Sequence, residues 1–208
     1  MSTPQPNQQS LSSYYRWHAH IYDLTRWAFL FGRRKLIHLA AQLSKPTRIL
    51  EIGCGTGKNL VELARVFPQA SIVGLDLSLD MLNQARPKLE TFGSRVQLLH
   101  QAYEAPVAPS PHGFDLIVFS YSLSMINPGY DEVIRLCKDD LRPGGIVAVV
   151  DFHSSRWPWF RQWMGVNHVR MEGQVLEGLE KHFAPLTSLT RKGYGDLWRY
   201  LLFAGQKR

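Results

Sequence analysis

Short apolar runs alternate with amphipathic segments through the middle of the chain. The runs are rich in Ile, Val, Leu and Phe and are predicted as strands at 47–53, 70–76, 95–100, 114–120 and 145–152. Between them, apolar positions at helical spacing predict helices at 57–68, 78–90 and 128–141. Ser78 is placed to cap the second helix, and the last apolar run is suited to burial on both faces. This alternation predicts a Rossmann-like, doubly wound and mostly parallel α/β sheet.

The two ends of the chain follow other patterns. Near the N-terminus, a helix is predicted by apolar positions close to one helical face, namely Tyr14, Trp17, Ile21, Leu24 and Phe31. A helical pattern resumes after Gly32, and residues 186–208 predict a hairpin that closes the sheet edge and brings the sheet to seven strands. We therefore expect a single domain, with an N-terminal helical lid over residues 1–46 and the α/β part over residues 47–208.

A glycine-rich loop joins the first predicted strand to the helix that follows it. In "LEIGCGTGKNL" (50–60) the glycines are Gly53, Gly55 and Gly57, which permit a tight turn and let backbone N–H groups approach a ligand closely. A dinucleotide-binding fingerprint would need glycine at position 58, where this chain has lysine. Asp76, at the end of the second predicted strand, is placed to accept hydrogen bonds from two ribose hydroxyls. The alternative is a loop that only makes a tight turn.

The pattern E-x-G-x-G-x-G, which starts at Glu51, resembles motif I of class I S-adenosyl-L-methionine (SAM)-dependent methyltransferases. The resemblance implies SAM as the cofactor and S-adenosyl-L-homocysteine as its product. It also implies a cofactor site made of Tyr22, Glu51, Gly53, Gly55, Gly57, Asp76, Leu77, Met81, Gln101, Ala102 and Ser120. Gln101 departs from the family pattern, because many relatives carry an acidic residue there, although its side-chain carbonyl can accept a hydrogen bond from the adenine.

Charge is distributed unevenly along the 208 residues, whose formal net charge is +7. Residues 1–48 carry seven Lys or Arg against one Asp, residues 49–151 carry eight against twelve acidic residues, and residues 152–208 carry nine against four. All six tryptophans fall in the two basic ends. Such ends predict contact with an anionic membrane surface, through Trp27, Arg33, Arg34, Trp157, Trp159, Arg161 and Trp163. The alternatives are solvated basic faces and tryptophans buried as core.

Other features bound the location and the partners. No apolar run is long enough to span a bilayer, and the polar first ten residues lack the pattern of a secretory signal. The two cysteines, Cys54 and Cys137, suggest no disulfide framework. The sequence therefore predicts a cytoplasmic protein that associates peripherally with a membrane. No metal site is predicted, and no nucleic-acid partner is expected, because no binding module for RNA or DNA is recognisable.

Three further stretches bear on the methyl acceptor: "YYRWHAHIYDLTRWAFLFGR", "VFSYSLSMI" and "VVDFHSS". Together they resemble the N-methyltransferases of bacterial betaine-lipid synthesis, the BtaB type. That resemblance implies three successive methylations of the amino group of diacylglyceryl-homoserine, with an aminocarboxypropyl-transferase of the same pathway as a partner. The alternatives are a phosphatidylethanolamine N-methyltransferase, a small-molecule or quinone O- or C-methyltransferase, and a SAM-binding protein without enzymatic activity.

Methylation of an amine sets two chemical requirements. The amine must be unprotonated when it reacts, so a nearby base assists, and a quaternary ammonium product is held best by aromatic faces. The predicted catalytic residues are Tyr15, Tyr121 and His153. His153 follows the apolar run at 145–152, at the carboxyl end of a central strand, where open α/β sheets bind ligands. It either accepts the proton or hydrogen-bonds the backbone.

Overall fold

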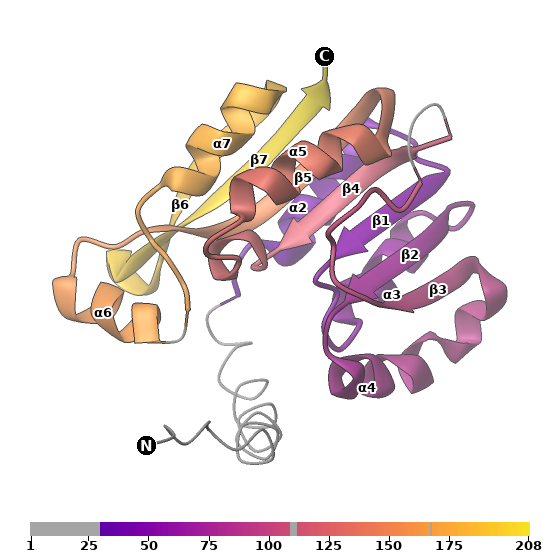
Figure 1. The fold of residues 1–208 in the computed structure, drawn as a ribbon, viewed down its shortest axis with the longest axis horizontal. Helices are drawn as coiled ribbons and strands as arrows, with labels where there is room; N and C mark the ends of the chain where they lie inside the picture. Colours follow the sequence, from indigo (N-terminus) through magenta and orange to yellow (C-terminus); the bar gives the residue numbers. More distant parts are fainter. Residues whose placement is uncertain (1–29, 109–111, 167) are drawn as a thin grey trace, which may run out of the picture. The chain divides into compact units, whose positions relative to one another are not determined.

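The computed structural model describes residues 30–108, 112–166 and 168–208, of which residues 32–208 form one compact unit. Its centre is a seven-stranded sheet of order β3-β2-β1-β4-β5-β7-β6 (Figure 1). The strands are β1 (Arg48–Ile52), β2 (Ser71–Asp76), β3 (Val96–His100), β4 (Phe114–Ser120), β5 (Leu141–Ser154), β6 (Phe183–Gly193) and β7 (Trp198–Lys207). The α-helices are α2 (Arg33–Leu43), α3 (Lys58–Val66), α4 (Leu79–Leu89), α5 (Tyr130–Asp140), α6 (Pro158–Val166) and α7 (Gln174–His182). Short 3₁₀ turns are η1 (Glu90–Arg95), η2 (Leu123–Met125) and η3 (Tyr194–Asp196).

The pairing of the strands confirms the predicted fold class. Strands β1 to β5 pair in parallel, whereas β7 runs antiparallel between β5 and β6. The predicted hairpin over residues 186–208 is β6 with β7, although it begins earlier, at Phe183. The predicted cap of α4 is also confirmed, since Ser78 Oγ accepts a hydrogen bond from the Met81 N–H at 3.3 Å.

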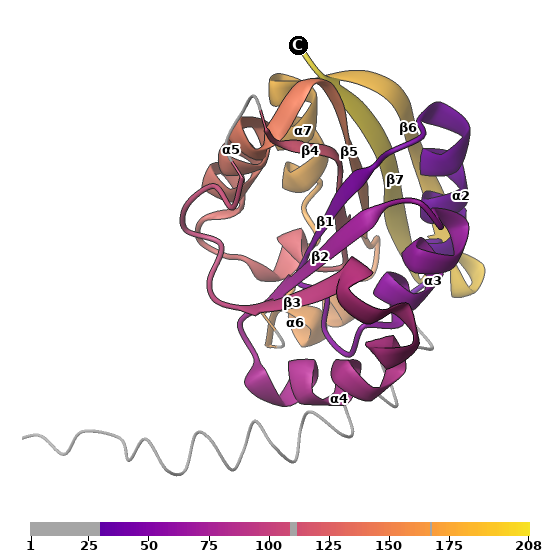
Figure 2. The ribbon, with the colours of Figure 1, turned by 90° about the vertical axis from the view of Figure 1, so that its right-hand side faces the viewer.

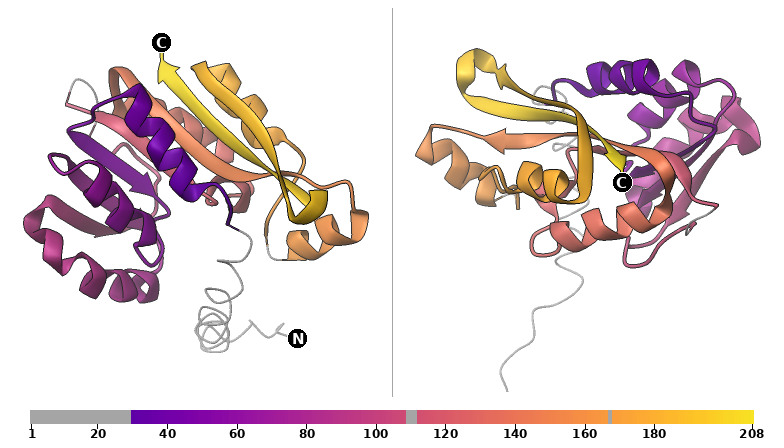
Figure 3. Two further views of the ribbon diagram at one scale, coloured as in Figure 1. Left: turned by 180° about the vertical axis from the view of Figure 1, so that it is seen from behind. Right: turned by 90° about the horizontal axis from the view of Figure 1, so that it is seen from above.

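Helices cover both faces of the sheet. Helices α2 and α3 pack together on one face, and α5 and α7 pack together on the other (Figures 2 and 3). Because both faces are covered, all of β4 is buried. Helix α2, which the sequence analysis assigned to the lid, packs against β5 and β7 through Leu36, Ile37 and Ala40. The earlier part of the predicted lid, residues 1–29, lies outside the described residues.

Two parts of the chain differ from the sequence-based expectation. The sequence predicts a strand at 145–152, but β5 begins earlier, at Leu141, and includes the "RPGG" stretch, with Gly144 at φ 75° and a register shift opposite β4. Helices α6 and α7 were not predicted. Helix α7 buries Val175 and Leu179 against the sheet. No helix in the described part of the chain is long and apolar enough to cross a membrane.

A buried carboxylate secures the connection between β3 and β4. Asp140, at the end of α5, accepts hydrogen bonds from the Tyr103 hydroxyl at 2.7 Å and from the backbone N–H groups of Val107 and Ala108 at 2.8 Å and 2.6 Å. Its side chain is fully buried. Since this connection has no helix over its described residues, the carboxylate supplies hydrogen bonds that regular structure supplies elsewhere.

Asp140→Ala should therefore lower the free energy of unfolding by about 3 kcal/mol, because it leaves three buried donors without an acceptor. Urea unfolding followed by far-ultraviolet circular dichroism measures this change. Asp139→Ala is the matched control: Asp139 is exposed and contacts Arg135, so its loss should leave stability nearly unchanged. Equal midpoints for wild type and Asp140→Ala would show that the connection is held by other contacts.

Candidate active site

The carboxyl ends of β1, β2 and β4 meet at one edge of the sheet. The backbone N–H groups of Gly53 and Cys54 donate to the Leu75 carbonyl of β2 at 2.8 Å and 3.0 Å. On the other side, Ser122 Oγ donates to the Ile52 carbonyl at 3.0 Å. These bonds hold the loop after β1 between the loops after its two neighbours. The crevice at this edge, where the strand order reverses, is the usual ligand site of such sheets.

The three glycines of the loop have different physical roles. A Cβ added to Gly53 would lie 2.8 Å from Ser122 Cβ, and one added to Gly57 would lie 2.9 Å from Ala85 Cβ, so both glycines allow close packing. Gly55 has a positive φ of 53°, yet a Cβ there would meet no atom of the described residues within 4 Å. This leaves room among them for a ligand directly against the loop.

Asp76 connects the loops that follow β1 and β2. Its Oδ2 accepts the Gly55 N–H at 2.7 Å, and its Oδ1 accepts the Ser78 N–H at 2.9 Å. Each carboxylate oxygen can accept more than one hydrogen bond, and Asp76 is only partly buried. The side chain is thus oriented by the backbone and still able to accept hydroxyl donors from a ligand.

A second polar chain runs from the glycine loop to helix α2. Asn59 Nδ2 donates to Glu51 Oε1 at 2.7 Å, and Arg33 Nε donates to Asn59 Oδ1 at 2.9 Å. The sequence analysis placed Arg33 at the membrane and did not single out Asn59. The structure instead places the Arg33 side chain, which is half-buried, next to the predicted cofactor site. Arg34, the next residue, is exposed and pairs with Glu62 at 3.2 Å.

The Glu51 carboxyl has an unusual environment. It is almost completely buried, and this desolvation raises its pKa from 4.5 to about 8, although the Asn59 hydrogen bond and the Arg33 charge act in the opposite direction. Glu51 Oε2 is buried without a hydrogen-bond partner among the described residues. Such an oxygen is costly unless a ligand forms a hydrogen bond with it.

The other predicted cofactor residues line the same edge. Leu77 is 71 % exposed and Met81 is partly buried, so apolar surface is available beside Asp76. Gln101 is exposed and Ala102 is partly buried, directly after β3. At the end of β4, Ser120 Oγ is buried with no partner among the described residues. Tyr22 lies outside the described residues.

The predicted catalytic residues are not brought together on one side of the sheet. Tyr121 is buried, has a positive φ of 57° and packs edge-on against Phe152, with ring centroids 4.7 Å apart. His153 follows Phe152 in β5 and therefore points to the opposite face, where its ring lies beside Gly173. The two side chains thus flank the end of β5. Tyr15 lies outside the described residues.

Burial also changes the proton affinity of groups at the end of β5. It lowers the pKa of His153, helped by the charge of Arg199, so the imidazole is neutral at pH 7. Asp151 is fully buried, and desolvation raises its pKa to about 6 in spite of hydrogen bonds from Ser124. The sequence analysis missed Asp151 and Ser124. The position of Asp151 at the end of an apolar strand is the feature that could have indicated it.

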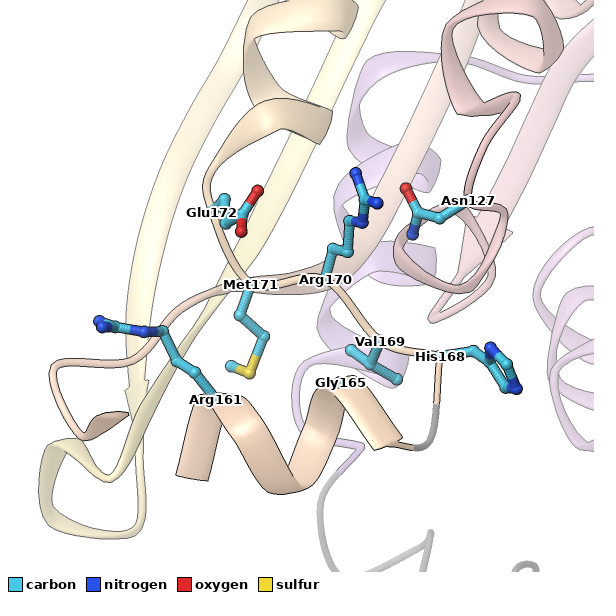
Figure 4. Close-up of a pocket in the computed structure, with 8 residues that line it drawn as sticks. All are labelled: Asn127, Arg161, Gly165, His168, Val169, Arg170, Met171 and Glu172. Atoms are coloured by element: carbon cyan, nitrogen blue, oxygen red, sulfur yellow. The ribbon is translucent and has the colours of Figure 1, made fainter. Parts of the chain in front are cut away.

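A cavity of about 360 Å³ lies between α6 and residues 168–172, near the loop after β4 (Figure 4). Its lining includes Met171, whose side chain points into the space towards α6, and Asn127. Figure 4 shows that the charged groups of Arg161 and Arg170 point in different directions, so no charged cluster converges there. The glycine loop, which does not line this cavity, is the better candidate for binding a cofactor.

Three of the four tryptophans in the basic C-terminal part are exposed, whereas Trp198 is fully buried. Trp157, Trp159 and Trp163 are all exposed, and Arg161 is exposed beside them. Trp27 lies outside the described residues. The structure therefore exposes Trp157, Trp159 and Trp163, in contrast to the alternative that they form core.

Comparison with known proteins agrees with this site. Residues 49–145 match the family model described as a methyltransferase domain. The ubiquinone/menaquinone biosynthesis C-methyltransferase UbiE of Syntrophotalea carbinolica is 33 % identical over 137 residues, which are 63 % of this chain and 56 % of that protein. A trans-aconitate 2-methyltransferase of Rhodopseudomonas palustris is 36 % identical over 109 residues, which are 51 % of this chain and 39 % of that protein. The chain thus spans about half the length, or less, of these curated relatives.

Solved structures share the fold. A Burkholderia thailandensis 1,6-didemethyltoxoflavin-N1-methyltransferase with bound S-adenosylhomocysteine has a TM-score of 0.73 at 18 % identity, covering 100 % of this chain and 93 % of that one. The N-methyltransferase NodS of Bradyrhizobium japonicum, also with S-adenosylhomocysteine, has a TM-score of 0.69 at 21 % identity, covering 84 % and 85 %. The family match thus assigns residues 49–145 to a methyltransferase domain, and the sheet has the fold of these solved methyltransferases.

The residues present fit SAM on the evidence of this structure. Gly55 leaves open space against the loop, and Asp76 keeps acceptor capacity for hydroxyl groups. Glu51 Oε2 and Ser120 Oγ are buried oxygens that lack partners among the described residues, so polar groups of a bound ligand would satisfy them. Leu77 and Met81 offer an apolar wall next to Asp76.

Asp76→Ala should weaken SAM binding about a hundredfold, because charge-assisted hydrogen bonds to the ribose are lost and the Gly55 N–H loses its acceptor. Isothermal titration calorimetry measures the affinity. The control is Asp80→Ala, because Asp80 is an exposed acidic residue in the first turn of α4, four positions after Asp76. This variant should bind SAM like the wild type. Unchanged affinity in Asp76→Ala would refute the cofactor site.

Glu51→Gln should gain stability relative to the wild type as the pH rises from 5 to 8. The folded-state pKa of about 8 lies above the ordinary 4.5, so the folded protein keeps a proton that the unfolded chain releases in this interval. Ionising the buried carboxyl is unfavourable, and glutamine avoids it. Urea unfolding of both proteins at several pH values gives the difference. A difference that does not vary with pH would show that Glu51 ionises normally.

Proposed function

We propose that this protein is a SAM-dependent N-methyltransferase that acts at a membrane surface on the amine of a lipid headgroup. The observation that carries the methyl transfer is the open glycine loop, with an oriented Asp76 and the partnerless oxygens of Glu51 and Ser120 around it. The betaine-lipid resemblance and the exposed tryptophans of the C-terminal part support the lipid acceptor. The expected reaction is three successive methylations of diacylglyceryl-homoserine.

The side chains of this site have defined tasks in that proposal. When bound, SAM supplies an electrophilic methyl group on a good leaving group, so positioning does most of the work. Asp76 holds the ribose end, and Glu51, oriented by Asn59, accepts a hydrogen bond at the other end of the site. His153, neutral at pH 7, is the group at the end of β5 that can take a proton from the attacking amine.

A quinone C-methyltransferase is the second candidate, and the relatives favour it. Both UbiE of Syntrophotalea carbinolica and a demethylmenaquinone methyltransferase of Thermus thermophilus resemble this chain, at 33 % and 32 % identity. On the other hand, two of the solved structures with the same fold are N-methyltransferases. A neutral base and a surface that contacts lipid would suit both a lipid amine and a quinone as the methyl acceptor. Only the methylated product distinguishes the two candidate functions.

Incubation with SAM and a bacterial lipid extract in neutral detergent micelles should add up to three methyl groups to a lipid primary amine, detected by mass spectrometry. Detergent presents the acceptor without any vesicle surface. His153→Gln keeps a polar side chain but cannot take up a proton. It should lower the methylation rate and remove the pH dependence of that rate that comes from the ionisation of His153. If a quinol gains the methyl group and no lipid amine does, the quinone candidate is correct.

A further inference from the structure

Helix α6 carries its largest side chains on the side that faces solvent. Trp157, just before the helix, is 41 % exposed, and Trp159 and Trp163 are 59 % and 50 % exposed. Only Phe160 and Met164 of this segment are buried. A helix of a globular protein normally turns its large apolar side chains towards the core, so three exposed indoles on one short segment need a separate explanation.

The exposure does not come from a loosely attached helix. The Phe160 ring stacks on Trp198 of β7, with centroids 5.8 Å apart and planes at 18°. Ser155 Oγ donates to the Leu197 carbonyl at 2.7 Å, and Arg161 Nη1 donates to the Ser155 carbonyl at 2.8 Å. The segment is therefore fixed to the β6–β7 hairpin, and Figure 1 shows α6 beside the turn of that hairpin.

The turn of the hairpin extends the same surface. Tyr194, in η3, is 56 % exposed, and its ring packs against Trp198 with centroids 5.0 Å apart. Trp198 thus contacts both Phe160 of α6 and Tyr194 of the hairpin turn. We call the exposed set Trp157, Trp159, Trp163 and Tyr194 the aromatic face. Tyr194 was not singled out by the sequence, because only the fold brings it next to the tryptophans.

The charge around the aromatic face has one sign along α6. Residues 152–171 contain no Asp or Glu, but they contain Arg156, Arg161 and Arg170. The Arg156 guanidinium lies over the Trp157 ring, 5.1 Å from its centroid, so charge and aromatic surface occur together. The acidic residue of the hairpin turn, Asp196, is paired with Arg199 at 2.9 Å. The complementary partner is therefore anionic.

The position of the aromatic face relates it to the active site. Helix α6 follows the carboxyl end of β5, and this is the sheet edge at which the loops after β1, β2 and β4 also meet. A surface bound by α6 would lie next to the openings of those loops.

We propose that the aromatic face docks the protein on an anionic lipid bilayer, with the tryptophan rings at headgroup depth and the arginines at the lipid phosphates. This proposal rests on the lipid acceptor proposed above. Indole rings favour this boundary, because the ring is buried there while its N–H stays hydrated. A second copy of the chain fits less well, since a two-fold interface pairs the same surface of both copies, and along α6 that surface carries Arg156 and Arg161 but no acidic side chain.

Flotation of the full chain with liposomes tests the docking. Vesicles of phosphatidylcholine with phosphatidylglycerol should bind the protein, and vesicles of phosphatidylcholine alone should bind it much less. Raising the salt from about 0.1 M to about 1 M shortens the Debye length from about 10 Å to about 3 Å, so it should release bound protein. The double variant Trp159→Ala with Trp163→Ala should stop floating while its affinity for SAM and its unfolding midpoint stay unchanged.

Two matched controls isolate the aromatic face. Leu186→Ala removes another exposed apolar side chain, which is 44 % exposed on β6. Leu186 is seven residues, or about 23 Å of strand, from the hairpin turn. This variant should float with the vesicles like the wild type. Arg156→Glu should weaken vesicle partitioning about tenfold or more. Arg65→Glu makes the same charge change at the end of α3, at the opposite edge of the sheet, and should have little effect. The Arg156 variant tests the proposal even if the double tryptophan variant fails to fold.

The outcomes separate docking from the reaction. Methylation of a lipid amine in detergent without flotation would overturn the docking and leave the function in place. Flotation that depends on the tryptophans, without any methylated lipid amine, would support the docking and refute the lipid acceptor. Flotation by the folded double variant, or a tryptophan-dependent dimer in ultracentrifugation with no vesicle binding, would overturn the proposed membrane face.

Discussion

The parallel pairing of β1 with β2 on one side and with β4 on the other is the constraint on which the site depends. It brings three strand ends to one edge, so residues more than twenty positions apart come within hydrogen-bond distance. The bond from the Gly55 N–H to Asp76 and the bond from Ser122 to the Ile52 carbonyl then close the loops on each other. Glycine is needed here because the loops pack at backbone distance. The cofactor site is thus a consequence of strand order, and it is finished by a few side chains.

Buried carboxyl groups lie at both ends of the parallel strands, and their surroundings differ between the amino ends and the carboxyl ends. At the amino ends of the strands, Asp140 accepts hydrogen bonds from three donors. Asp115 is also buried there, and its pKa is below the ordinary value because Thr47 and Arg48 donate hydrogen bonds to it and Arg142 is charged. At the carboxyl edge, desolvation raises the pKa of Asp151 to about 6 and that of Glu51 to about 8. Groups that only hold structure are satisfied, whereas the incompletely satisfied Glu51 lies where a ligand is expected.

Tryptophan shows how one residue type takes opposite roles in neighbouring positions of the fold. Trp198 is fully buried and supports both α6 and the hairpin turn, while Trp159 and Trp163 on α6 are exposed. All of them lie in the basic C-terminal part of the sequence. The composition therefore indicates an anionic partner. Which side chains of α6 can contact that partner depends on which face of the helix the Phe160–Trp198 stack buries. Trp159 and Trp163 both contact Phe160, which in turn stacks on the buried Trp198.

The sequence by itself determined the alternation of strands and helices, the hairpin at the sheet edge, the Ser78 cap and the glycine loop with Asp76. Each of these depends on local periodicity or on backbone freedom at a named position. Only the tertiary structure decided that Arg33 turns inward to Asn59, that Tyr121 and His153 flank β5 from opposite faces, and that Asp140 closes the β3–β4 connection. The physical reason is that a side chain's partners come from strands and helices far away in the sequence. The packing of these strands and helices across the sheet decides which side chains meet, and the local sequence pattern carries no information about that packing.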